Sequence, residues 1–130
     1  MSEWKKVKLG DISISNRGYY GIGASAVPYD SKKYTYLRIT DINDDSSLNS
    51  SDLKSVDDLD AEKYLLKKND IVFARTGNST GRNYFFELEE NKWVYAGFLI
   101  KFSLDPKLVF PKYVKYHYMS KTYWDWIHSY

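Results

Sequence analysis

The sequence predicts an α+β fold, with a mixed or antiparallel curled sheet and short helices at the N- and C-terminal ends. Three observations support this prediction. Runs of β-branched and aromatic residues recur through the middle of the chain, glycine-containing loops separate them, and the hydrophobic period changes after Pro111. The 130 residues have the length of one domain, so we assign 1–130 to a single domain with its own core.

Strands dominate the first part of the predicted fold. Apolar residues within 4–12 predict a short segment that docks on the core, and the glycine-rich stretch 16–23 predicts a loop or a bulged strand. The β-branched and aromatic run 34–40 predicts a strand, and 71–75 predicts another.

The last part of the chain predicts a hairpin and then helix. Segments 84–88 and 93–104 flank a polar turn at 89–92, as the two strands of a hairpin would. Pro111 suits the first turn of a helix, and the tyrosines and tryptophans after it predict one or two short helices with an aromatic face.

Charge is unevenly distributed, although the net charge is only +2. Residues 1–38 hold seven Lys and Arg against three Asp and Glu, residues 39–63 hold two against eight, and residues 64–130 hold ten against six. We expect the acidic stretch at about 43–60 to be a solvated loop rich in Asp, Ser and Asn. The two basic segments that flank it are typical of a surface that binds nucleic acid.

Composition excludes several classes of protein. The chain contains no cysteine, which excludes a disulfide scaffold, a thiolate zinc site and a cysteine nucleophile, and which fits a reducing, cytoplasmic location. The longest apolar run, 96–100, is far too short to span a membrane, and no apolar signal sequence follows Met1. We therefore expect a soluble cytoplasmic domain with no membrane partner.

The glycine motifs do not match those of nucleotide-binding enzymes. Only three residues separate Gly77 from Gly81, whereas the phosphate-binding loop needs four between its glycines and then Lys-Ser/Thr. The stretch 21–26 matches the dinucleotide fingerprint in form, but Pro28 leaves no room for the helix that must begin there.

No metal or cofactor site is predicted. His117 and His128 are too isolated to form a metal site, and the prolines are never adjacent, as the catalytic element of a methyltransferase would require. We therefore expect no enzymatic activity, no metal and no cofactor. One alternative is a small metal-dependent nuclease that uses Asp70 and Glu90, although Glu90 falls in a predicted turn.

Polar loops offer the chemistry of nucleic-acid recognition instead. Arginine can form paired hydrogen bonds with guanine, asparagine with adenine, and Ser, Thr and backbone N–H groups with phosphates. These residue types are concentrated at 75–83, with a second group at 16–20 and a third at 32–34. On chemistry alone, a well-hydrogen-bonded turn with exposed arginines explains 75–83 equally well.

A family resemblance decides between these interpretations. It covers nearly the whole chain, from Trp4 to about Ile127, and its motifs occur in a fixed order at 4–12, 36–42, 66–77, 97–102 and 111–120. In this order they resemble the target recognition domain of the specificity (S) subunit of type I restriction-modification systems.

The resemblance implies a function without catalysis. Each recognition domain of that family reads half of a split double-stranded DNA site through the major groove. Modification subunits then methylate adenine and restriction subunits join the complex. This chain ends at Tyr130, before the spacer helix expected after 130, and has one recognition domain. We therefore expect a half specificity subunit or a domain of a longer one, with a second recognition domain or a homodimer as partner.

The resemblance and the loop chemistry together give the expected site residues. For base readout we expect Arg75, Thr76, Asn78, Ser79 and Arg82, and second to them Arg17, Tyr19 and Tyr20. For phosphate contacts we expect Lys32, Lys33 and Arg38. For binding to the partner subunits we expect Tyr113, Tyr116, Trp124 and Trp126. The main alternative function is a protein-interaction module that uses this aromatic C-terminal face.

Overall fold

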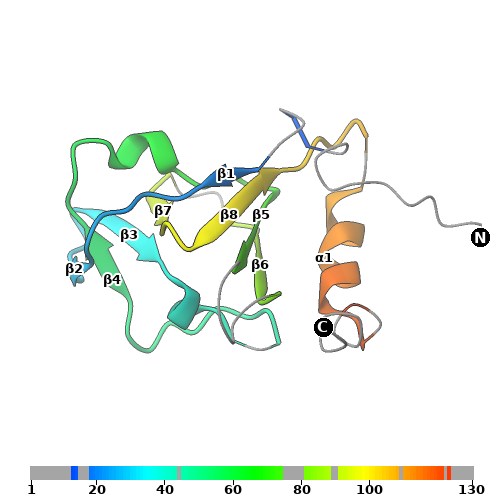
Figure 1. Ribbon diagram of the computed structural model, residues 1–130, viewed down its shortest axis with the longest axis horizontal. Helices are drawn as coiled ribbons and strands as arrows, with labels where there is room; N and C mark the ends of the chain where they lie inside the picture. The colour runs from blue at the N-terminus through cyan, green and yellow to red at the C-terminus, as the bar shows by residue number, and fades with distance from the viewer. Residues whose placement is uncertain are drawn as a thin grey trace, which may run out of the picture.

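The computed structural model describes residues 13–14, 18–43, 45–74, 81–88, 91–108, 110–121 and 123. Within these residues, two four-stranded sheets and one α-helix form a layered α+β fold (Figure 1). The predicted fold class is therefore confirmed, but the strands form two sheets and not one. The predicted docking segment 4–12 and the N-terminal helix lie outside the described residues. No helix among the described residues is long and apolar enough to cross a membrane.

The first sheet is antiparallel and has the strand order β1-β8-β5-β6. Its members are β1 (Tyr19–Tyr20), β5 (Asp70–Ala74), β6 (Asn83–Phe86) and β8 (Leu99–Ser103). The predicted strand at 71–75 is thus confirmed as β5 up to Ala74. The glycine-rich stretch at 16–23 contains the short edge strand β1, which pairs with β8.

The second sheet has the order β2-β4-β3-β7 and contains one parallel pair, β3 with β7. Its members are β2 (Val27–Pro28), β3 (Tyr34–Leu37), β4 (Lys54–Val56) and β7 (Trp93–Tyr95). The strand predicted at 34–40 ends at Leu37, because the chain then turns into the 3-10 helix η2 (Ile39–Asp41). A second 3-10 helix, η3 (Ala61–Tyr64), precedes β5.

The predicted hairpin around 89–92 is wrong. β6 pairs with β5, whereas β7 pairs in parallel with β3 of the other sheet. Segment 93–104 is also not one strand, since the chain passes between the sheets from Tyr95 to Leu99. The alternating pattern predicts which face of a strand is buried and says nothing about its partner. Phe86 and Trp93 face one core from opposite sheets, with ring centroids 6.2 Å apart.

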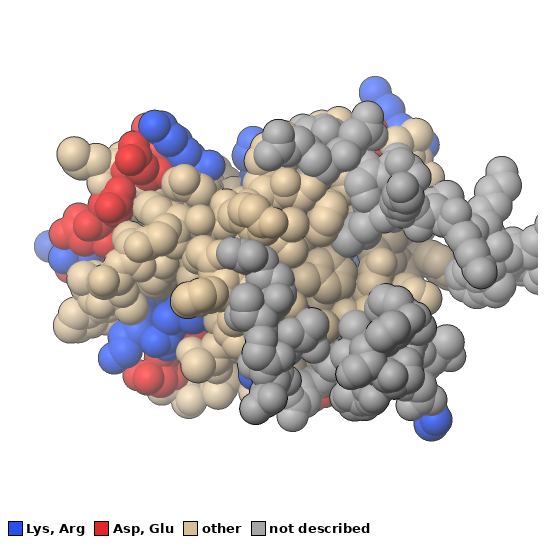
Figure 2. Space-filling view, viewed as in Figure 1, with Lys and Arg blue, Asp and Glu red and all other residues tan. Residues whose placement is uncertain are grey.

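The acidic stretch at 43–60 is not all loop, because it contains β4 between β2 and β3. Ser55 and Val56 of β4 are buried, and the three-residue strand is too short to produce a visible alternation. Carboxylates around it pair with lysines, at 3.3 Å from Lys33 to Asp57 and 3.4 Å from Lys54 to Asp52. Figure 2 accordingly shows acidic and basic side chains interspersed at the end of the molecule that contains β2 and β4.

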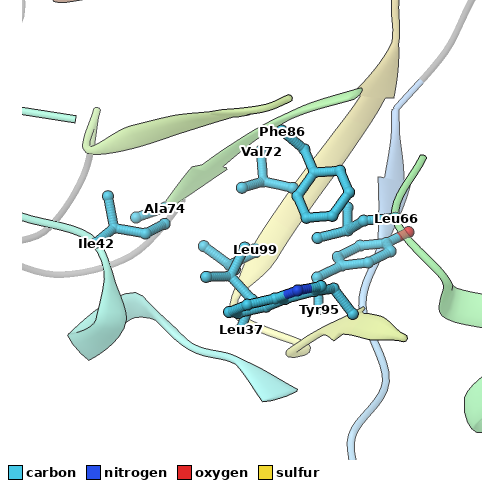
Figure 3. Packing of buried hydrophobic residues seen from close by; sticks show 9 residues of the cluster. Leu37, Ile42, Leu66, Val72, Ala74, Phe86, Tyr95 and Leu99 are labelled. Atoms are coloured by element: carbon cyan, nitrogen blue, oxygen red, sulfur yellow. The ribbon is translucent and has the colours of Figure 1, made fainter. Parts of the chain in front are cut away.

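The main core lies between the two sheets (Figure 3). β3, β5, β6, β7 and β8 contribute residues from one face, as the period of two requires. From β5, for example, Val72 and Ala74 face this core, whereas Ile71 and Phe73 pack on the other side of the sheet. The buried members of the core are Leu37, Ile42, Leu66, Val72, Ala74, Phe86, Trp93, Tyr95 and Leu99.

Two smaller clusters cover the outer faces of the sheets. Ile22 and Ala61 pack against the outer face of the second sheet, on Tyr36, Val56 and Val94. The helix α1 (Pro111–Met119) covers the outer face of the first sheet through its buried residue Val114. Pro111 occupies the first turn of α1, as predicted.

The backbone of Gly21 passes close to the segment that joins the two sheets. Gly21 N donates to Leu99 O at 3.2 Å, and Ile22 N donates to Tyr95 O at 3.0 Å. A Cβ atom on Gly21 would overlap the carbonyl oxygens of Tyr95 and Ala96. Glycine is therefore required at position 21 by close approach of backbone to backbone, which also explains this part of the dinucleotide-like motif.

Replacing Gly21 should destabilise the fold far more than replacing its neighbour Gly23. We expect Gly21→Ala to lower the free energy of unfolding by about 1–3 kcal/mol or more, because backbone atoms must move to admit the methyl group. A Cβ on Gly23 meets nothing within 4 Å, so Gly23→Ala is the matched control and should be neutral or stabilising by ~0.4–1 kcal/mol. Urea unfolding of both variants measures the difference, and equal losses would contradict this account.

Candidate nucleic-acid interface

The register of the first sheet brings two predicted readout segments to the same end. Tyr20 lies opposite Ile100, Ile100 opposite Phe73, and Phe73 opposite Asn83, so these four residues form one row across the sheet. Arg82 immediately precedes Asn83. Tyr20 and the start of β6 are three strand spacings apart, which is roughly 14 Å.

Two backbone hydrogen bonds join the chain before 75–80 to the chain after it. Ala74 N donates to Arg82 O at 2.8 Å, and Gly81 N donates to Ala74 O at 3.2 Å. Gly81 has φ 91, in the left-handed region that favours glycine. Arg82 is half-buried immediately before β6. The other predicted members of this readout group lie outside the described residues: Arg75, Thr76, Asn78 and Ser79.

The second readout group is exposed at the edge of the same sheet. Tyr19 and Tyr20 form β1 and are 37% and 58% exposed, whereas Arg17 lies outside the described residues. Lys101 on β8 lies beside them, with Nζ 5.9 Å from the centre of the Tyr19 ring and 5.4 Å from that of Tyr95. The sequence analysis missed Lys101, which appeared to be one polar position in an alternating strand.

Asp70, proposed for the alternative nuclease, is bound within the fold. Its carboxylate is buried, accepts a hydrogen bond from Lys67 N at 2.8 Å, and lies 3.9 Å from Lys101 Nζ. Burial raises the pKa of Asp70, and the hydrogen bond from Lys67 N and the charge of Lys101 oppose this shift. Glu90 is outside the described residues. Among the residues that the structure covers, no three His, Asp or Glu side chains gather as a metal site would require.

Two of the predicted phosphate-binding lysines line an open groove of about 410 Å³. Lys32 and Lys33 form the turn before β3, and Lys92, which the sequence analysis missed, joins them from the turn before β7. Asp57 and Asp58 also line the groove. Its charge is therefore mixed, and Lys33 is already paired with Asp57.

This lysine groove is at the far end of the second sheet from the readout segments. Lys33 precedes the first residue of β3, whereas Leu37 at the other end of β3 accepts a hydrogen bond from Ala96 N at 2.9 Å. Ala96 forms the bridge to Ile22, two residues after Tyr20. The length of β3 separates the two places by roughly 10 Å, so the structure does not bring the lysines and the readout residues together.

Arg38 is bound within the fold. Its Nε and Nη2 donate to the two carboxylate oxygens of Asp41 at 3.1 and 3.0 Å, and Nη2 also donates to Asp52 O at 2.8 Å. Asp41 is buried, and its hydrogen bond raises the pKa of the Arg38 guanidinium. This arrangement gives Arg38 a role in joining β3 to the segment before β4, which is different from the phosphate contact expected of it.

The aromatic residues of α1 divide into two groups. Tyr113 and Tyr116 are 45% and 60% exposed, and Phe110 before the helix is 71% exposed. Tyr118 packs inward against Phe73, with ring centroids 4.9 Å apart. The predicted partner-binding residues Trp124 and Trp126 lie outside the described residues. The exposed group is therefore Phe110, Tyr113 and Tyr116.

One exposed aromatic residue near the readout end was not predicted. Phe98, in the turn between β7 and β8, is 62% exposed. It adjoins Leu99, whose carbonyl accepts the hydrogen bond from Gly21 N. The sequence analysis placed Phe98 inside one long strand, so its exposure at a turn carried no signal. An apolar ring at this place suits contact with a thymine methyl group.

The family described as type I restriction modification DNA specificity domain matches residues 1–126. Comparison with curated proteins finds no match for the chain.

The buried ion pair of Arg38 gives a prediction about stability. We expect Arg38→Ala to lower the free energy of unfolding by about 2–3 kcal/mol, because it leaves the buried carboxylate of Asp41 without its cationic partner and with only the backbone N–H of residue 38 as donor. Lys33→Ala removes an exposed ion pair and serves as the control, with an expected loss of at most ~1 kcal/mol. Urea unfolding at neutral pH compares them. Similar small losses for both variants would show that Arg38 is not needed by the fold.

The raised pKa of Asp70 predicts how stability changes with pH. A raised pKa in the folded state gives a contribution to stability that is complete below the ordinary Asp value of 3.8 and is lost as pH rises through the folded value. Asn does not titrate, so Asp70→Asn should gain stability relative to the unchanged chain as pH rises from about 4 to 7. Urea unfolding across this range tests the sign, and a relative loss with rising pH would contradict it.

Proposed function

Because the chain belongs to the type I restriction modification DNA specificity domain family, we propose that it recognises a short sequence in double-stranded DNA as a recognition domain of the specificity subunit of a type I complex. Members of this family recognise DNA sequences in restriction-modification systems and act with methyltransferase and restriction subunits. In this proposal the chain selects the site, and those partner subunits methylate adenine and cut. The chain itself contributes recognition without catalysis, in the cytoplasm.

The placement of Tyr20 and Arg82 is the observation that supports this proposal best. They come from segments more than sixty residues apart in the sequence, yet the register of the first sheet brings them to one end. Their separation of roughly 14 Å corresponds to about four base-pair steps of 3.4 Å. An arginine at one edge and tyrosines at the other would therefore span a short half-site within one face of a groove.

The proposed contacts follow from side-chain chemistry. Arg82 forms the paired hydrogen bonds to guanine O6 and N7, together with Arg75, Thr76, Asn78 and Ser79 from the adjacent segment. Tyr19, Tyr20 and Arg17 contact the other part of the half-site. Lys32, Lys33 and Lys92 bind phosphates farther along the duplex. We do not retain Arg38 among the phosphate contacts, because Asp41 and Asp52 O occupy its guanidinium.

The exposed aromatic surface at α1 supports a second interaction. Phe110, Tyr113 and Tyr116 present large apolar faces with polar tips, as residues of protein interfaces do. We propose that this surface, together with Trp124 and Trp126, binds a partner subunit or a second recognition domain. The protein-interaction module considered from the sequence thus becomes a part of the DNA-recognition complex.

Selection from a randomised duplex library at ~0.1 M salt tests the proposal, since nonspecific phosphate binding is weakened there. We expect enrichment of a short motif. Arg82→Ala and Arg75→Ala should each relax one position, at about 1–3 kcal/mol. Lys32→Ala should weaken binding to all sequences alike and reduce the salt dependence. Lys63→Ala, which removes the same charge from η3, is the matched control. It should leave the affinity for DNA and its salt dependence unchanged.

Three results would contradict the proposal. Recovery of DNA without an enriched motif would indicate a surface that only holds phosphates. If Arg75→Ala and Arg82→Ala both keep the full sequence preference, the assignment of these residues to base readout is wrong. Protein binding that survives high salt, with no DNA recovered even at low salt, would favour the interaction module alone.

A further inference from the structure

Asn83 is a buried polar residue at the point where β6 begins. Its side chain is 1% exposed, and each of its polar atoms has a partner. Nδ2 donates to Tyr118 O at 2.9 Å and to Gly81 O at 3.2 Å, while Oδ1 accepts from Ser46 Oγ at 3.2 Å. One amide therefore joins the end of α1, the turn at Ser46 and the residue that precedes Arg82.

Gly81 O has a second donor, the hydroxyl of Tyr123 at 2.8 Å. Gly81 O and Arg82 N belong to the same planar peptide group, so the two hydrogen bonds on the oxygen fix the orientation of that group. The next peptide group is fixed as well, because Arg82 O accepts from Ala74 N at 2.8 Å. Both peptide planes beside the Arg82 Cα are held, which sets the direction of its Cα–Cβ bond.

The Tyr123 hydroxyl is itself placed by a stack of aromatic rings. Tyr123 is 7% exposed and packs edge-on against Tyr118, with ring centroids 4.8 Å apart. Tyr118 packs edge-on against Phe73 of β5, at 4.9 Å. The stack therefore connects the C-terminal segment to the strand that runs beside β6.

We propose, on the premise that the domain recognises DNA as set out above, that Asn83 and Tyr123 are positioning residues for Arg82. Neither reaches DNA, since both are buried. They act through the Gly81 carbonyl and hold Arg82 in the direction from which it meets a base edge. A paired arginine contact depends strongly on this direction, because both of its hydrogen bonds must align at once.

The most sensitive variant is Tyr123→Phe, which removes the hydroxyl and keeps the ring. Tyr118→Phe is the matched control. Within the described part of the chain the Tyr118 hydroxyl makes no hydrogen bond, so the same substitution leaves the bonds on Gly81 O intact. Selection from the random library identifies, in the unchanged chain, the base position that Arg82→Ala relaxes. Competition between duplexes that differ at this position then measures the preference of each variant.

We expect Tyr123→Phe to reduce the preference at the Arg82 position by about twofold to tenfold, which is the effect of one hydrogen bond. Affinity for duplexes without the motif should stay near that of Tyr118→Phe, and the midpoint of thermal unfolding should fall by only a few degrees, about the loss that one hydrogen bond causes. In an Arg82→Ala background, Tyr123→Phe should have no further effect on preference, because it acts through Arg82. A merely structural role would lower affinity in both backgrounds.

Each other result overturns the inference in a recognisable way. Full preference in Tyr123→Phe would show that the bond to Gly81 O does not position Arg82. An equal loss of base preference in Tyr118→Phe would show that ring packing causes the effect. A further loss of base preference in the Arg82→Ala background would show that Tyr123 acts through another residue. If the unchanged chain enriches no motif, the proposed function fails together with this inference, whereas a motif retained by Tyr123→Phe overturns the inference alone.

Discussion

Two consecutive backbone N–H groups connect the sheets on which the whole fold depends. Gly21 N bonds to Leu99 O in the first sheet, and Ile22 N bonds to Tyr95 O in the second. This connection requires glycine at position 21, because any Cβ there would meet the carbonyls of residues 95 and 96. It fixes the register of β1 on β8, and with it the row that places Tyr20 at the same end of the sheet as Arg82.

Buried polar residues perform a second task, which is to hold the segments that leave the strands. The Asp41 carboxylate accepts hydrogen bonds from the Arg38 guanidinium after β3, and the Asp70 carboxylate accepts one from Lys67 N at the start of β5. Asn83 Nδ2 donates to Gly81 O just before β6. Each group has its partners, as burial demands. Apolar packing in the core thus fixes the sheets, whereas these polar contacts fix the chain at the ends of strands. Asn83 lies at the end of the first sheet that carries Arg82, and Asp70 lies at the opposite end.

The sequence predicted the features that depend on local pattern. The strand at β5 and the helix that begins at Pro111 follow from alternation and from the fixed φ of proline, and the ordered motifs predicted the family that the comparison confirms. Strand pairing could not be predicted, because alternation shows which face of a strand is buried and not which strand lies beside it. The hairpin predicted at 89–92 was therefore wrong. Arg38 was assigned to phosphate from its charge, and the sequence does not show that Asp41 and the carbonyl of Asp52, fourteen residues away, both accept hydrogen bonds from its guanidinium.

The contacts that hold Arg82 in place also explain how such a domain would change its target without changing its fold. The acceptors are the main-chain carbonyls of Gly81 and Arg82, which remain whatever side chain occupies position 82. Tyr20 is likewise held by the backbone pairing of β1 with β8 while its side chain is exposed. A substitution at either position would alter the group presented to DNA and leave every one of these bonds in place. In the proposed interface, recognition chemistry would thus be separated from stability, since the backbone holds the position and the side chain would supply the specificity.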